Sequence, residues 1–145
     1  MTAPTEPDEP PQWPAPLVGD LVWCWFPQPP NPAPGPKARP ALVVGVETRE
    51  DGVIVSVVYG TSQRLDRLTT GEFAITRLGH PQAFALAGLA FDTKFNFNSV
   101  VDLPWGDAFF KVSPRPRYGQ TPKLGSLHPS LLRAVEVAYQ AAKLR

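Results

Sequence analysis

An arginine and a threonine lie where two apolar segments of the chain begin and end. Arg39 follows a glycine- and proline-rich stretch and comes just before the strongly apolar residues 41–46. A guanidinium stays charged and presents forked donors, so it can neutralise the extra negative charge of a pentacovalent phosphate transition state, although it makes a poor general base. Thr61 follows Gly60 at the end of residues 53–59, where its hydroxyl could hydrogen-bond a phosphoryl oxygen and the glycine would let a phosphate approach the backbone. The pair predicts a phosphate-binding site.

Each of these residues also has a purely structural interpretation. Arg39 could pair with a carboxylate such as Asp20, and Thr61 with Ser62 could simply close a strand with a local turn. Asp102 could accept a proton if apolar neighbours made it a stronger base than an ordinary aspartate, and it could equally cap the end of a strand. The residue types leave these alternatives open.

Aromatic side chains could stack on unpaired bases, a mode that favours single strands. The candidates are Trp23, Trp25, Phe95, Phe97 and Trp105. Core packing explains most of them better, because Trp23 and Trp25 share one side of a strand and a large aromatic face is ordinarily buried. Lys94, Asn96 and Asn98 are expected on a loop from which they could reach RNA.

Side chains that ligate metals are sparse. The single cysteine, Cys24, lies in an apolar segment and is expected to act as a small buried hydrophobe, with a reactive thiol the less favoured alternative. His80 and His128 are far apart in the sequence and lack the spacing of zinc ligands. We therefore expect neither a metal nor a cofactor.

The net charge of +1 is unevenly distributed along the chain. Residues 1–16 hold three acidic residues and no basic one, whereas residues 111–145 hold seven basic residues and one acidic residue. Any attraction for nucleic acid must therefore come from a local patch. The candidates for this patch are Lys111, Arg115, Arg117 and Lys123, which could otherwise merely solvate a loop.

Short segments rich in β-branched and aromatic residues must position these side chains. Strands are predicted at residues 17–26, 41–46, 53–59, 72–76 and 100–103, with a candidate sixth at 109–112. Asp51 and Gly52 form a hairpin signal, so the second and third of these strands should pair antiparallel. Several short strands at this spacing predict a small barrel.

One helix and one stiff loop complete the prediction. Apolar residues recur with helical spacing over residues 131–144, Pro129 falls in the first turn, and Lys143 lies in the last turn, where the helix dipole favours cations. Residues 27–40 hold seven prolines and predict a stiff loop that could wall a groove. The fold class is mainly β (α+β), a small half-open barrel with a C-terminal helix.

A chain of 145 residues can build one domain with a real core. Residues 1–16 contain six prolines and few apolar side chains, so we expect a disordered tail before a domain at residues 17–145. No apolar run approaches the roughly 18 residues of a membrane span. The acidic, proline-rich N-terminus also differs from the basic and then apolar pattern of a secretory signal. A cytoplasmic protein that does not enter a membrane is expected.

Three segments, in this order, resemble the signatures of the PemK/MazF family of toxins. They are residues 19–23 (Gly-Asp-Leu-Val-Trp), residues 35–44 (Gly-Pro-Lys-Ala-Arg-Pro-Ala-Leu-Val-Val) and residues 59–62 (Tyr-Gly-Thr-Ser). The resemblance spans residues 17–144. It implies an SH3-like barrel, a homodimer and a cognate antitoxin as partner. It also implies metal-independent cleavage of single-stranded RNA, in which the RNA's own 2′-hydroxyl attacks the adjacent phosphodiester.

The resemblance also assigns roles to residues. Arg39 and Thr61 match the family's catalytic arginine and threonine, and Asp102 matches an aspartate that serves as a base or positions RNA in some members. The expected RNA contacts are Lys37, Ser62, Gln63 and Lys94. The arginine that some plasmid-borne members carry two residues before this aspartate is Val100 here, so a two-residue acid/base scheme lacks one donor.

Functions from different classes remain open. The first is a growth-inhibiting toxin of a type II toxin-antitoxin system that acts as an endoribonuclease. The second is a non-catalytic SH3-like module that binds a protein or a nucleic acid, which Val100, the near-neutral charge and the proline-rich loop favour. A gyrase poison on the same general fold finds no specific support in the sequence.

Overall fold

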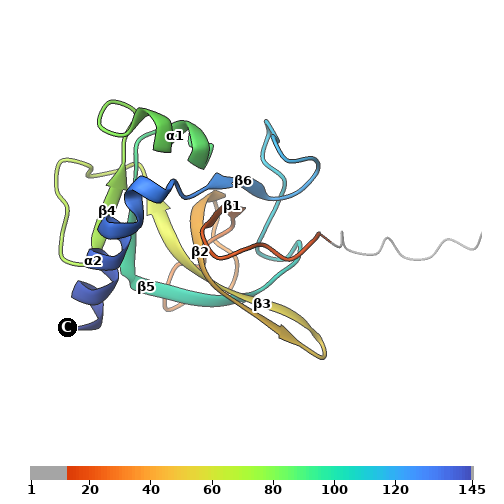
Figure 1. The fold of residues 1–145 in the computed structure, drawn as a ribbon. Coiled ribbons are helices and arrows are strands. Elements are labelled where there is room, and N and C mark those ends of the chain that lie inside the picture. The colour runs from red at the N-terminus through yellow and green to blue at the C-terminus, as the bar shows by residue number, and fades with distance from the viewer. Residues whose placement is uncertain (1–12, 145) are drawn as a thin grey trace, which may run out of the picture.

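The computed structural model describes residues 13–144, and six strands in it form one antiparallel sheet with the order β4-β5-β3-β2-β1-β6 (Figure 1). The strands are β1 (Asp20–Cys24), β2 (Arg39–Arg49), β3 (Gly52–Thr61), β4 (Glu72–Ile75), β5 (Thr93–Pro104) and β6 (Lys123–Ser126). The helices are α1 (Pro81–Ala87) and α2 (Leu132–Lys143), and a short 3-10 helix, η1 (Pro129–Leu131), leads into α2. Strands β4 and β6 are the edges of a sheet that does not close. The predicted mainly β, half-open fold with a C-terminal helix is confirmed.

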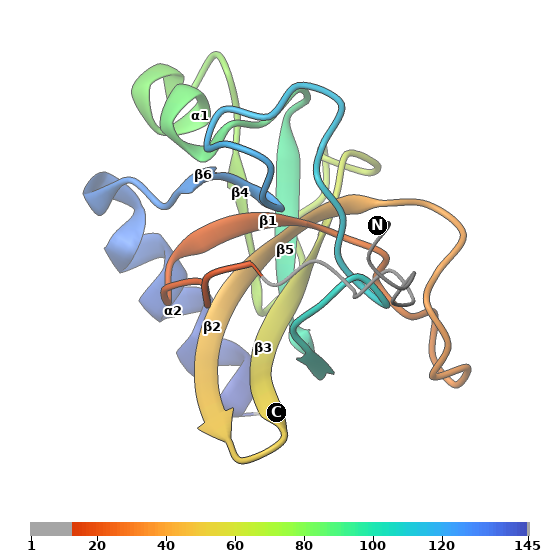
Figure 2. The same ribbon diagram turned by 90° about the vertical axis from the view of Figure 1, so that its right-hand side faces the viewer.

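The long β2–β3 hairpin forms the centre of the sheet. Its register pairs Ala41 with Tyr59 and Arg49 with Gly52, which confirms the predicted hairpin. The register shifts between Val43 and Gly45, and such a bulge bends the strands. Figure 2 shows the tip of the hairpin projecting away from α1 and β6.

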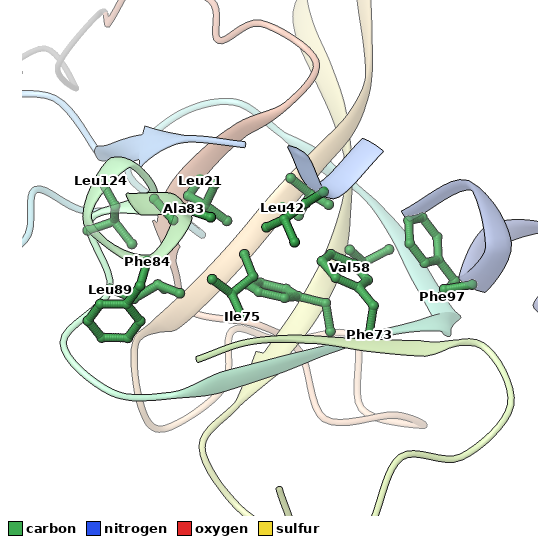
Figure 3. Packing of buried hydrophobic residues seen from close by; sticks show 14 residues of the cluster. Leu21, Leu42, Val58, Phe73, Ile75, Ala83, Phe84, Leu89, Phe97 and Leu124 are labelled. Atoms are coloured by element: carbon green, nitrogen blue, oxygen red, sulfur yellow. The ribbon is translucent and has the colours of Figure 1, made fainter. Parts of the chain in front are cut away.

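Two hydrophobic cores lie on opposite faces of this sheet, because successive side chains of a strand point to opposite sides. The first core joins strand residues such as Leu21, Leu42 and Val58 to residues of both helices (Figure 3). The second core contains the alternate strand residues Val22, Cys24, Ala41, Val55, Val57 and Leu103, covered by Phe26 and Phe110. Strand β1 therefore contributes apolar side chains to both cores, Leu21 to the first and Val22 and Cys24 to the second.

The first strand and the C-terminal helix are close to their predicted positions. Strand β1 is shorter than residues 17–26, and α2 begins one residue after the predicted start because η1 precedes it. Pro129 occupies the first turn of η1, where its missing N–H costs no hydrogen bond. Within residues 13–144, no helix is long and apolar enough to cross a membrane.

The sixth strand was predicted at the wrong place. Residues 109–112 form no strand. Only Phe110, which is buried in the second core, joins Cys24, through an isolated β-bridge. The sixth strand is Lys123–Ser126, whose Lys-Leu-Gly-Ser sequence lacks a β-branched residue. Helix α1 was not predicted, although Pro81 in its first turn and Gly88, left-handed at its C-cap with φ of 71°, are helix signals.

Strand β5 is much longer than the predicted residues 100–103. Phe95 and Phe97 point into the first core, whereas Lys94, Asn96 and Asn98 alternate with them on the other side. The prediction of a loop for these three polar residues is therefore wrong. The polar residues favoured a loop, but Phe95 and Phe97 recur with the period of two that is typical of a strand.

The packed part of the chain begins before the boundary expected at Leu17. The ring of Trp13 contacts that of Trp105 edge-on at 5.9 Å, and Nε1 of Trp105 donates hydrogen bonds to the carbonyl oxygens of Trp13 and Pro14. Pro16 is buried. Of the disordered tail expected at residues 1–16, residues 1–12 lie outside the described part of the chain.

Candidate functional site

Arg39 is the first residue of β2, where the proline-rich loop enters the sheet. It pairs with Cys24 of β1, and cross-strand partners share a face, so its side chain lies at the edge of the second core. Its guanidinium lies over the ring of Tyr59, 5.6 Å from the centroid. This cation-π contact holds the planar group half-buried while leaving its edge donors for another partner.

Arg39 forms no ion pair with a carboxylate of the described residues. Asp20, its considered partner, accepts a hydrogen bond from the Leu17 N–H at 3.0 Å and pairs with Lys123 at 3.5 Å. The structure thus does not support the structural interpretation of Arg39. A half-buried guanidinium without a carboxylate partner suits an anion from outside the chain.

Thr61 is the last residue of β3 and lies at the same end of the sheet as Arg39, the first residue of β2. The paired part of these two strands ends at Ala41 and Tyr59, so Arg39 and Thr61 each lie two residues beyond the last pair. The Thr61 hydroxyl oxygen accepts a hydrogen bond from the Gln63 N–H at 3.1 Å, so the local turn is present. The O–H of Thr61 remains able to donate to a phosphoryl oxygen.

Gly60 has a packing role at this point. A Cβ there would lie 2.7 Å from the Pro40 carbonyl oxygen and 2.7 Å from the Phe95 ring. Only glycine therefore lets β2 and β3 approach this closely above the first core. The close approach holds Pro40 of β2 against Gly60 of β3, and these two residues adjoin Arg39 and Thr61 in the sequence.

Two hollows meet at Arg39. The smaller, of about 320 Å³, lies beside the proline-rich loop, and its lining includes Phe26, Gln28, Lys37, Tyr59, Asn96 and Ser99. The larger, of about 660 Å³, contains Ser62 and Gly60 in its wall. Lys37 and Ser62, two of the expected RNA contacts, thus border different hollows, while Gln63 is exposed beside them. Asn96, one of the residues expected to reach RNA, lines the smaller hollow, from a strand and not from a loop. Tyr59 was not predicted as a site residue, although it belongs to one of the signature segments.

Lys94 is buried and already paired, so it is not exposed for an RNA contact. Its Nζ donates to the Arg67 carbonyl at 2.9 Å and lies 3.3 Å from the Glu72 carboxylate. Burial alone would raise the pKa of Glu72, but hydrogen bonds from Thr69 and the contact with Lys94 lower that pKa below its ordinary value. Arg67 lies in the loop that follows Thr61, and Lys94 pairs with Thr61 across the strands. The contacts of Lys94 with Arg67 and Glu72 therefore hold this loop against β5.

Asp102 lies far from Thr61 in the folded chain and on the opposite face of the sheet from Arg39. It pairs with Ser56, whose hydroxyl donates to its carboxylate at 2.5 Å, five residues along β3 from Thr61. At about 3.4 Å per residue this separation is on the order of 17 Å. Its neighbours Val101 and Leu103 pack in the second core, so Asp102 points to the opposite face from Arg39. One copy of the chain does not bring the three predicted catalytic residues together.

The remaining candidate for reactivity, Cys24, is fully buried, as predicted, and burial raises its pKa to about 12. A thiol with this pKa stays protonated at neutral pH and is a weak nucleophile. Within the described residues, no group of three His, Cys, Asp or Glu side chains is arranged as a metal site.

Solved structures share this fold. One is an endoribonuclease in complex with its cognate antitoxin, from mycobacterial species, with a TM-score of 0.56 and 21% identity over 89% of this chain and 95% of that chain. Another is an endoribonuclease from mycobacterial species, with a TM-score of 0.53 and 18% identity over 90% of this chain and 92% of that chain. No protein-family model and no curated protein sequence matches the chain. At these identities the likeness concerns the fold.

Proposed function

We propose that this protein is an endoribonuclease toxin of the PemK/MazF type, which cleaves single-stranded RNA without a metal or another cofactor. The observation that carries the proposal is Arg39, which is half-buried, has no carboxylate partner among the described residues and lies at the same end of the β2–β3 pair as Thr61. The likeness of the whole fold to endoribonucleases supports it, since one of them binds a cognate antitoxin. The proposal includes an antitoxin partner, a homodimer and a cytoplasmic site of action.

The proposed reaction needs no nucleophile from the protein. The 2′-oxygen of a ribose attacks the adjacent phosphorus, the bond from phosphorus to the 5′-oxygen breaks, and a 2′,3′-cyclic phosphate and a 5′-hydroxyl result. Arg39 donates to the non-bridging oxygens as they gain charge, and the Thr61 hydroxyl donates a further hydrogen bond.

Water carries the protons in this proposal. The 2′-hydroxyl proton passes to water, and the departing 5′-oxygen takes a proton from water. Neither hollow beside Arg39 is lined by a carboxylate or a histidine of the described residues. Catalysis in this proposal therefore depends mainly on electrostatic stabilisation by Arg39 rather than on a general base.

Cleavage in the presence of EDTA tests the proposal. We expect the purified chain to cut unstructured RNA faster than a duplex of the same sequence, because only a flexible strand can bring the 2′-oxygen in line with the departing 5′-oxygen. Arg39→Ala should cut far more slowly, whereas Arg133→Ala, which removes an exposed positive charge on α2, should not change the rate. Equal rates for Arg39→Ala and the unaltered chain would contradict the assignment.

The absence of a carboxylate or histidine from the described lining of both hollows also favours a second candidate, a module that binds RNA without cutting it. In that case, the unaltered chain binds RNA in an Arg39-dependent way and leaves it intact. The same experiment therefore separates the two functions.

A further inference from the structure

The larger hollow is built from three connections that meet beyond Arg39. Arg77 comes from the connection between β4 and α1, Phe91 from that between α1 and β5, and Arg115 and Arg117 from that between β5 and β6. Trp23 also lines the hollow. Figure 2 shows the β5–β6 connection passing close to α1, and the Arg117 guanidinium donates to the Ala85 carbonyl of that helix at 3.0 Å. We call this hollow the arginine groove.

Positive charge dominates the arginine groove. Four arginines line it, namely Arg39, Arg77, Arg115 and Arg117, and no acidic residue of the described chain does. The Arg77 guanidinium lies over the Phe84 ring at 5.0 Å, while the nearby Asp92 carboxylate accepts from the Arg77 backbone N–H. None of these arginines forms an ion pair with a carboxylate among residues 13–144. Uncompensated cations in a concave surface attract an anionic ligand.

An exposed aromatic ring stands in the same lining. Phe91 is 72% exposed, although large apolar side chains are usually buried, and Trp23 is a half-buried residue of the same lining. Arginines interleaved with accessible aromatic rings are typical of surfaces that bind unpaired nucleotides, where cations follow the phosphates and rings stack on bases.

We propose that the arginine groove binds unpaired nucleotides next to the phosphate held by Arg39, with Arg77 and Arg115 on phosphates and Phe91 stacked on a base. This proposal rests on the proposed function for the position of the reacting phosphate. Arg39 borders both the groove and the smaller hollow. An RNA strand that passes Arg39 can therefore continue from the smaller hollow directly into the groove. Arg117, already bonded to α1, holds the wall in place.

Binding of an RNA that cannot be cleaved tests the arginine groove separately from catalysis. The probe is a fluorescein-labelled 12-nucleotide RNA of mixed sequence with 2′-fluoro sugars, followed by fluorescence anisotropy from low to moderate salt. Arg77→Ala and Arg115→Ala should each weaken binding and lower the slope of log Kd against log salt by about 0.7 for each phosphate that is no longer neutralised. The matched control, Arg133→Ala, should change neither quantity, because this exposed arginine lies on α2, away from the groove.

Phe91 gives a test that does not depend on charge. Phe91→Ala should weaken binding about five- to a hundredfold, as expected for the loss of one stacked base, while leaving the salt slope unchanged. Phe91→Trp should restore the affinity. A melting curve for each variant checks that these exposed positions leave the fold intact.

The outcomes distinguish this inference from the proposed function. If Arg77→Ala and Arg115→Ala bind the RNA like the unaltered chain, the groove proposal is overturned even if cleavage is observed. If binding depends on the groove but the chain cuts no RNA, the groove proposal stands and the nuclease proposal falls. If labelled hexaglutamate binds in an Arg115-dependent way and the RNA does not, the groove takes an acidic protein segment, which also overturns the proposal.

Discussion

At the scale of single residues, the surroundings of Arg39 decide what it can do. Lys94, which pairs with Thr61 across the strands, is buried against Glu72, so its charge is already balanced. Arg39 rests on the Tyr59 ring and has no such partner among the described residues. Its charge is therefore available to an anion from outside the chain.

The first prediction follows from the forked geometry of a guanidinium. Arg39→Ala should slow single-turnover cleavage about a hundredfold, and Arg39→Lys should recover only part of this loss, because a lysine keeps the charge but not the paired donors. Full recovery by lysine would reduce the role of Arg39 to that of a point charge.

A second prediction at this scale concerns Asp102. Its carboxylate faces away from Arg39 and accepts a hydrogen bond from Ser56. Asp102→Asn should therefore leave the single-turnover rate unchanged and change the melting temperature only slightly, since the residue is exposed. A large fall in rate with unchanged RNA affinity would mean that Asp102 reaches the reacting phosphate from a second copy of the chain.

At the scale of elements, the ion pair between β4 and β5 supports the end of β3. The pKa of Glu72 lies below its ordinary value of 4.5 in the folded chain, so the stability that this carboxylate contributes is present above that value and is lost as the pH falls through the lowered folded pKa. We predict a melting temperature that falls between about pH 5 and pH 3. Glu72→Gln should be less stable at neutral pH, because Lys94 stays buried without its partner, and should show a flatter dependence in acid.

A matched control for the acid dependence is available on the hairpin. Glu47 pairs with Arg49 at 2.9 Å, but both side chains are exposed, so the pair adds little to stability. Glu47→Gln should keep the acid dependence of the unaltered chain. If Glu47→Gln flattened the curve as much as Glu72→Gln, the buried pair would not be its source.

The N-terminal segment gives a further prediction for an element. Trp13 packs on Trp105, which in turn contacts Phe110 in the second core at 4.7 Å between ring centroids. Deleting residues 1–12 should leave the melting temperature unchanged, whereas deleting residues 1–16 should cost on the order of 1–3 kcal/mol of unfolding free energy, because apolar surface around Trp105 becomes exposed to water. Equal stability of the two truncated chains would contradict a structural role for Trp13.

How far the sequence predicts these elements depends on local pattern. The β2–β3 hairpin has a turn signal between two apolar runs, and α2 has an apolar face with helical spacing, so both are predicted. Strand β6 has no such pattern, since one of its four residues is Gly125. A side chain at this position would clash with α1, because a Cβ on Gly125 would lie 2.1 Å from the Leu86 carbonyl oxygen. This requirement arises only in the packed chain. The predicted hairpin places Arg39 and Thr61 at the same end of the sheet, whereas the burial of Lys94 and the separation of Asp102 depend on the register of β5.

At the scale of the whole molecule, the open sheet leaves its strand ends accessible. Two loops, the proline-rich loop and the β5–β6 connection, border hollows on either side of Arg39, and the helices cover the first core. This arrangement places one arginine, which has no carboxylate partner among the described residues, between two surfaces that an extended strand could follow. In the function proposed above, Arg39 stabilises a phosphate that is attacked by the RNA's own 2′-hydroxyl.

The most direct measurement uses a short RNA whose cleaved bond has been mapped, and a second RNA identical except for a single 2′-deoxyribose before that bond. Both are incubated with the purified chain in EDTA under single-turnover conditions, and the product ends are identified by mass. We predict a 2′,3′-cyclic phosphate and a 5′-hydroxyl from the all-ribose RNA and no cleavage at the altered bond. Cleavage of the deoxy-substituted RNA at the same bond would contradict the proposed mechanism.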